Sequence, residues 1–119
     1  MRTDRIYDLE ERTYKYALSC RNFIRNQLKS IPNFEYSKQL IRSSGSVAAN
    51  YIEANEALSV KDYYHRVKIC RKEIKESILW LKLLTTENNQ ELDNLLKESN
   101  ELMKIFGSII CSKDDNKVK

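Results

Sequence analysis

Apolar residues along most of the chain recur at steps of three and four, which is the spacing of one face of an α-helix. The most regular stripe lies in the third quarter of the chain and runs through Tyr63, Val67, Cys70, Ile74, Ser77, Leu81 and Leu84. The first quarter has a similar stripe, Ile6, Leu9, Thr13, Tyr16, Cys20, Ile24 and Leu28. The last has Leu92, Leu95, Ser99, Leu102, Phe106 and Ile109, backed by Leu96, Met103 and Ile110. This spacing is typical of helices that pack side by side in a bundle.

Three short breaks separate the periodic segments. In the first, Pro32 disfavours helix at the residue before it, and Asn33 can cap the helix that follows. The second break places Ser59 three residues before Asp62, and the third places Asn88 three residues before Glu91; both are the spacing of a capping box.

These breaks predict helices at about 4–30, 34–57, 60–85 and 89–111. Because each connection is short, consecutive helices should lie antiparallel, up-down-up-down. Residues 112–119 have no apolar period and are predicted to be disordered. We therefore expect a single all-α domain at 1–111, an antiparallel four-helix bundle.

The second predicted helix contains six small residues among positions 43–49, including Gly45. Small side chains allow a neighbouring backbone to approach closely, which favours tight packing at this point. The alternative is a weak stretch of helix that is stabilised by packing elsewhere, since glycine costs roughly 1 kcal/mol relative to alanine.

Composition narrows the class of protein. The chain has 119 residues, with 21 Lys+Arg and 17 Asp+Glu for a net charge of +4, and it contains only 2 Gly and 1 Pro. So few turn-forming residues argue against a β-sandwich or β-barrel. No run approaches the roughly 18 apolar residues of a membrane span, and residues 1–4 do not resemble the start of a signal peptide. We therefore expect a cytoplasmic protein with no membrane partner.

Candidate catalytic and metal-binding residues are scarce. Cys20, Cys70 and Cys111 are widely spaced, and His65 is the single histidine, so no usual zinc pattern is present. We expect free thiols, two of them in the core, and neither a metal nor a cofactor. Glu73 and Glu76 are expected to form ion pairs with Arg66, Lys72 or a neighbouring helix rather than to act in catalysis. The sequence thus predicts no enzymatic activity.

The third predicted helix carries a basic row. Residues 1–30 hold 7 basic and 4 acidic groups, and residues 59–85 hold 7 and 3, so the positive excess lies on helices one and three. The candidate nucleic-acid-binding residues share one outward face of helix three, and they are Lys61, Lys68, Arg71, Lys72, Lys75 and Lys82. Such a row could follow the phosphate backbone of RNA or DNA. The alternative is a solvated face that keeps the helix soluble.

The same helix has more apolar residues than one face of a four-helix core can use. The residues outside its core stripe are Tyr64, Ile69, Ile78, Leu79, Trp80 and Leu83. A second apolar face predicts self-association, so that the protein is its own partner. It equally allows an interaction scaffold that binds another protein and no nucleic acid.

One segment resembles a known family. Residues 46–54 read Ser-Val-Ala-Ala-Asn-Tyr-Ile-Glu-Ala, and residues 59–63 follow as Ser-Val-Lys-Asp-Tyr, with Glu73 and Glu76 further on. This combination is similar to the bacterial four-helix-bundle proteins of the 23S rRNA intervening-sequence family. The chain departs from many members at Ala54, where they have Gly, and at Arg71 and Lys72, where they have small residues.

The resemblance implies a ring-like homopentamer of antiparallel bundles. It also implies that Asn50, Glu53, Ser59 and Asp62 mark a structural corner between helices two and three. The resemblance also suggests kinship with the accessory protein of diversity-generating retroelements. The partners it implies are therefore rRNA or another nucleic acid and, by analogy, a reverse transcriptase.

Overall fold

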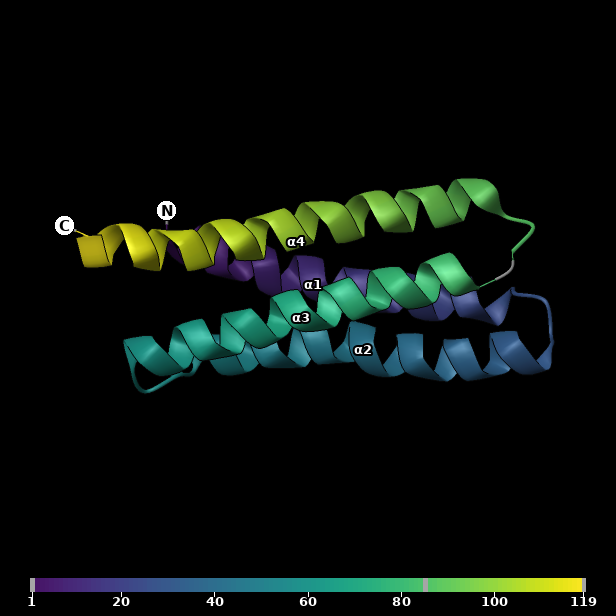
Figure 1. The fold of residues 1–119 in the computed structure, drawn as a ribbon, viewed down its shortest axis with the longest axis horizontal. Helices are drawn as coiled ribbons and strands as arrows, with labels where there is room; N and C mark the ends of the chain where they lie inside the picture. The colour runs from purple at the N-terminus through teal and green to yellow at the C-terminus, as the bar shows by residue number, and fades with distance from the viewer. Residues whose placement is uncertain (1, 85, 119) are drawn as a thin grey trace.

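The computed structural model describes the backbone of residues 2–84 and 86–118, and the side chains of residues 8–84 and 86–112. Its elements are α1 (Arg2–Arg25), α2 (Ile31–Asn55), α3 (Val60–Leu83) and α4 (Asn89–Val118), with no strand in the described residues. The loops between them alternate between the two ends of a rod with extents of 51 × 23 × 21 Å (Figure 1). In the described part of the chain, no helix has the length and apolar character needed to cross a membrane.

Two helix ends differ from the prediction. α1 ends at Arg25 because the N–H groups of Asn26 and Gln27 bond to carbonyls three residues back, which tightens and closes the last turn. α4 continues to Val118, whereas we expected helix to 111 and disorder at 112–119. No Gly or Pro follows Gly107, so the backbone contains nothing that stops the helix.

The helix caps agree with the sequence at two of three breaks. The Ser59 hydroxyl accepts the N–H of Asp62 at 3.0 Å, and the Asn88 side chain accepts the N–H of Glu91 at 3.1 Å. At the first break the prediction is wrong, because the extended residue Ser30 caps α2 and places Pro32 in its first turn. Asn33 is buried instead, and its side-chain amide donates to the Leu28 carbonyl at 3.0 Å.

The predicted core stripes of α3 and α4 are confirmed. Every stripe residue from Val67 to Leu84 is buried, Tyr63 packs against the core, and the α4 stripe is buried or half-buried throughout. In α1 the prediction needs correction. Phe23 rather than Ile24 is fully buried, and Leu28 is 48% exposed because it lies beyond the end of the helix. The side chain of Ile6 lies outside the described residues.

Hydroxyl pairs connect the helices inside the core. The Tyr16 and Ser99 hydroxyls are 2.7 Å apart and join α1 to α4, and those of Ser43 and Ser77, also 2.7 Å apart, join α2 to α3. The Ser77 hydroxyl also hydrogen-bonds to a carbonyl of its own helix. Because a buried polar group without a partner is costly, these pairs disfavour sliding of one helix past another.

The three cysteines are free, as expected. Cys20 and Cys70 are buried, and Cys111 is exposed. Burial raises the pKa of Cys20 and of Cys70 to about 12, so both thiols stay protonated at neutral pH.

The small-residue segment of α2 packs against two helices: Ser43 pairs with Ser77 of α3, and Ser44 lies beside Cys20 of α1. Ser43, Ser44 and Val47 are all buried. Gly45 is not a point of close approach, because a Cβ built on it meets no atom within 4 Å. The tight-packing interpretation therefore holds for the serines and fails for the glycine.

Replacing Gly45 with alanine should raise the free energy of unfolding by about 0.5–1 kcal/mol, because the change removes backbone entropy from the unfolded chain and meets no steric conflict. Urea unfolding followed by circular dichroism measures it. Ala49→Gly, at an exposed position of the same helix, is the matched control and should lower stability by a similar amount. A loss of stability in Gly45→Ala would show that another chain packs against this face.

Candidate nucleic-acid interface

α3 presents the predicted basic residues together. Because Val67, Ile74 and Leu81 face the core together with Cys70 and Ser77, the opposite side of the helix faces solvent. Five of the basic side chains are exposed and the sixth, Arg71, is half-buried; the exposed ones are Lys61, Lys68, Lys72, Lys75 and Lys82. At seven-residue intervals, successive lysines of the main row are about 10 Å apart along the axis.

These cations have no acidic partner in the described part of the structure. The ion pairs found there use Arg12, Lys15, Lys38 and Arg42, none of which belongs to α3. Glu76, the carboxylate beside the basic row, is bonded to Arg42 of α2 at 2.9 Å. The positive charge of this face is therefore not neutralised by neighbouring side chains.

The basic excess of α1, in contrast, is partly neutralised. The Arg12 guanidinium makes two 2.8 Å hydrogen bonds to Glu98 and one of 3.0 Å to Glu101, both on α4. The hydrogen bonds with Glu98 are the main reason that the pKa of Arg12 is raised. Lys15 lies 3.6 Å from Glu11 on its own helix. The expected basic face of helix one is thus weaker than that of helix three.

Two acidic residues of α3, Glu73 and Glu76, pair across the bundle. Glu73, with a side chain only 8% exposed, lies 3.3 Å from the Arg42 guanidinium, which also holds Glu76. Of the predicted partners, the neighbouring helix is correct, whereas Arg66 and Lys72 are wrong. Arg66 instead donates to the Asn50 side chain at 3.2 Å. The partner that each glutamate finds depends on which helix packs beside α3. The periodicity of a single helix does not reveal that packing.

The residues of the predicted corner between α2 and α3 do not act together: two lie at the start of α3, and a third connects the two helices. Ser59 caps α3, and Asp62 lies exposed in the first turn, where a negative charge stabilises the helix dipole. Asn50 contacts Arg66 and not the turn, so it ties α2 to α3. The Glu53 side chain is exposed and makes no hydrogen bond or ion pair with another described side chain.

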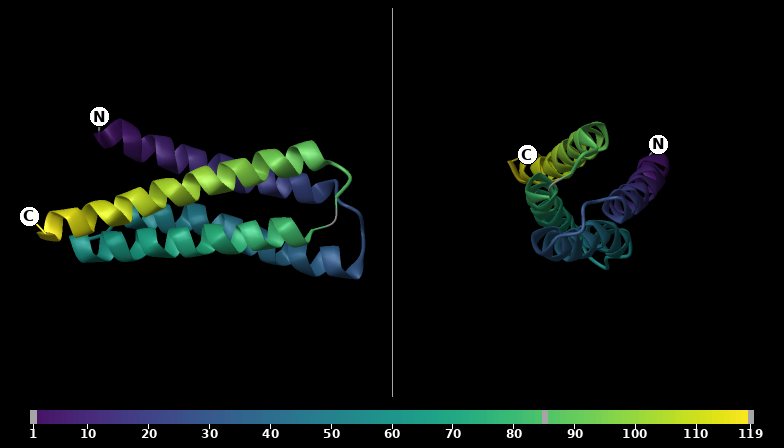
Figure 2. Two further views of the ribbon diagram at one scale, coloured as in Figure 1. Left: turned by 45° about the horizontal axis from the view of Figure 1, so that its top comes forward. Right: turned by 90° about the vertical axis from the view of Figure 1, so that its right-hand side faces the viewer.

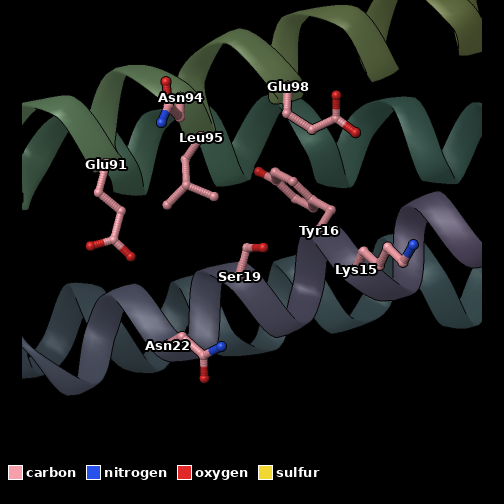
Figure 3. Close-up of a pocket in the computed structure, with 8 residues that line it drawn as sticks. All are labelled: Lys15, Tyr16, Ser19, Asn22, Glu91, Asn94, Leu95 and Glu98. Carbon is pink, nitrogen blue, oxygen red and sulfur yellow. The ribbon is translucent and has the colours of Figure 1, made fainter.

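A groove of about 420 Å³ lies between α1 and α4. Among the helix pairs that contact each other these two are the least closely packed, and they separate towards the N-terminus of α1 (Figure 2). Tyr16 and Leu95 extend into it (Figure 3). The Tyr16 hydroxyl is paired with Ser99, and burial raises its pKa, so it stays protonated at neutral pH. The described side chains include no cluster of three acidic, histidine or cysteine groups for a metal.

Comparison with known proteins places this fold in a family. The family model of the 23S rRNA-intervening sequence protein matches residues 7–108. The chain belongs to the family of 23S rRNA-intervening sequence proteins. A crystal structure from Bacteroides thetaiotaomicron, of a protein with unknown function from the S23 ribosomal protein family, has 28% sequence identity and a TM-score of 0.74. The alignment covers 86% of this chain and 97% of that chain. No curated protein matches the sequence.

In this intervening-sequence protein, the apolar surface of α3 is smaller than its sequence indicates. Leu79 and Leu83 are 48% and 43% exposed. The other predicted interface residues are half-buried, and they are Tyr64, Ile69, Ile78 and Trp80. Trp80 packs on the core of its own subunit and stacks on Tyr36, with ring centroids 6.1 Å apart.

A second apolar surface was not predicted. Where α1 leads into α2, exposed Leu28, Ile31, Phe34 and Ile41 line a groove of about 850 Å³. The signal was present in the sequence, because Phe34 and Ile41 are seven residues apart and lie one residue after the buried positions Asn33 and Leu40. They therefore form a separate stripe beside the core stripe of α2.

Proposed function

We propose that this protein is a non-enzymatic, homo-oligomeric helical bundle of the cytoplasm that binds RNA or DNA through the basic face of α3. The observation that carries the proposal is the set of six cations on one helix face without a carboxylate partner among the described side chains. Unpaired lysines displace the counterions around nucleic-acid phosphates, which gives strong affinity with little sequence preference.

The geometry of the row supports a phosphate contact. From Lys61 to Lys82 the four main lysines extend along about 31 Å of helix. This length is close to one turn of a nucleic-acid duplex. The neutralised basic residues of α1 would contribute less, since Arg12 is already engaged by Glu98 and Glu101.

For the assembly, we propose antiparallel bundles in a ring, with a pentamer as the resemblance to the family implies. The alternating loops of Figure 1 support the antiparallel arrangement. Leu79, Leu83 and the apolar groove at the start of α2 supply surface that a second copy can cover. By analogy with the retroelement accessory protein, a reverse transcriptase is a further candidate partner.

Fluorescence anisotropy with a labelled, structured rRNA fragment at increasing KCl concentration tests the proposal. Each neutralised phosphate contributes about −0.9 to the log–log slope for a duplex, so a slope of roughly −3 to −5 is expected. A fragment with the same fold and a scrambled sequence should bind with similar affinity. No binding, or binding that does not change with salt, would contradict the proposal.

The alternative is an interaction scaffold that binds a protein partner and no nucleic acid. The apolar groove at the start of α2 is the observation in its favour. Affinity purification from nuclease-treated and untreated lysates separates the two functions. A protein partner that persists after nuclease treatment, together with no RNA binding in the anisotropy assay, supports the scaffold.

A further inference from the structure

Arg71 differs from the lysines around it because it is half-buried in the groove that they share. The groove, of about 500 Å³, is formed by α3 and α4 and is lined by Lys68, Arg71, Lys72, Lys75, Glu76 and Ile110. Four of these six residues are cations. Arg71 is half-buried, whereas the three lysines are exposed.

Gly107 of α4 lies beside this guanidinium. A Cβ built on Gly107 would lie 3.6 Å from Arg71 Nε, so the arginine side chain passes directly over the backbone of the facing helix. At this distance a methyl group would make an ordinary van der Waals contact with Arg71, so alanine would also fit here.

The positive charges of the groove outnumber its negative charges. Glu76 is its single acidic residue and is bonded to Arg42 on the opposite side of α3. Among the described side chains, Arg71 forms no hydrogen bond or ion pair. A half-buried guanidinium has five N–H donors and is partly removed from water, so an anion would satisfy both its charge and its hydrogen bonds.

We propose that this groove is a phosphate subsite, in which Arg71 binds two oxygens of one phosphodiester and Lys68, Lys72 and Lys75 add positive charge. The proposal rests on the proposed function and deepens it, because it names the group of the nucleic acid that is held and the residue that orients it. Arginine matches two phosphate oxygens with its planar fork, whereas lysine acts as a point charge. The row lysines then supply general affinity, and Arg71 fixes the position of the backbone.

The variant Arg71→Lys tests the subsite because it keeps the charge and removes the fork. At fixed salt, its affinity for the rRNA fragment should fall about tenfold, with an unchanged salt slope. Lys97→Arg, at an exposed position of α4 outside both the groove and the basic row, is the control and should bind like the wild type. Circular dichroism of both variants verifies that the helices are intact.

A second readout does not depend on RNA. In NMR spectra, the Arg71 Nε–H resonance, identified by its absence in Arg71→Lys, should shift on titration with millimolar inorganic phosphate and not with chloride at equal ionic strength. The subsite requires both results. If RNA binds, but Arg71→Lys binds equally well or the resonance does not move, the subsite is overturned and the proposed function remains. If RNA does not bind while the resonance moves, the groove takes free phosphate, and the nucleic-acid assignment is overturned together with the proposed function.

Discussion

Replacing Lys61, Lys68, Lys75 and Lys82 together with glutamine should weaken binding to the rRNA fragment on the order of 100-fold at low salt. Each lysine that contacts a phosphate releases a counterion, so the log–log salt slope should become shallower by about 3 to 4. The fold should be retained, because all four side chains are exposed and none forms an ion pair in the described structure. Anisotropy titrations at several KCl concentrations measure both quantities.

The control for this variant removes the same net charge elsewhere. Lys15, Lys38, Lys97 and Lys104 are exposed lysines on the other three helices. Their replacement by glutamine should reduce affinity less than tenfold through the general field of the protein. An equal loss in the two variants would show that binding follows net charge, and the basic face of α3 would then have no special role.

Replacing Phe106 with alanine should lower the free energy of unfolding by about 3–5 kcal/mol, because it empties a large volume in a closely packed core. Phe106 is 0% exposed and packs against the Tyr51 ring, with centroids 6.1 Å apart. A loss of this size is a large part of the total stability of a small domain. Urea unfolding monitored by circular dichroism gives the value, and a loss below about 1 kcal/mol would contradict the assigned packing of α4.

Leu79→Ala is the informative comparison. Leu79 is 48% exposed in the single chain, so the substitution in a monomer should cost less than about 1 kcal/mol. If Leu79 is covered in an oligomer, the cost should be larger and the unfolding midpoint should depend on protein concentration. A small loss of stability that does not change when the protein concentration is raised about 50-fold would remove Leu79 from the proposed interface.

Much of the fold could be predicted because its helices are amphipathic and its breaks carry strong local signals. The stripe from Val67 to Leu84 and the caps at Ser59 and Asn88 depend on residues three or four positions apart, and such neighbours contact each other in any helix. The end of α1 was harder to predict from the sequence, because Leu28 continues the apolar spacing although the helix has already ended at Arg25.

The candidate site was predictable in its charges and not in its partners. The lysines of α3 are outward in the sequence pattern and exposed in the structure. Whether a cation is free, however, depends on a second helix. Arg12 is neutralised by α4, whereas Arg71 has no carboxylate partner among the described side chains and lies near Gly107 and Ile110 of α4. Both are arginines on a helix, and nothing in their local sequence distinguishes them.

The sequence by itself determined the number of helices, the core faces of α3 and α4 and the position of the basic row, because each follows from the helical period along a single segment. The tertiary structure decided which charges are neutralised, how Trp80 is covered by Tyr36, and which apolar residues at the start of α2 stay exposed. Those properties depend on how one helix is rotated and shifted against another, and that arrangement is set by packing among side chains far apart in the chain.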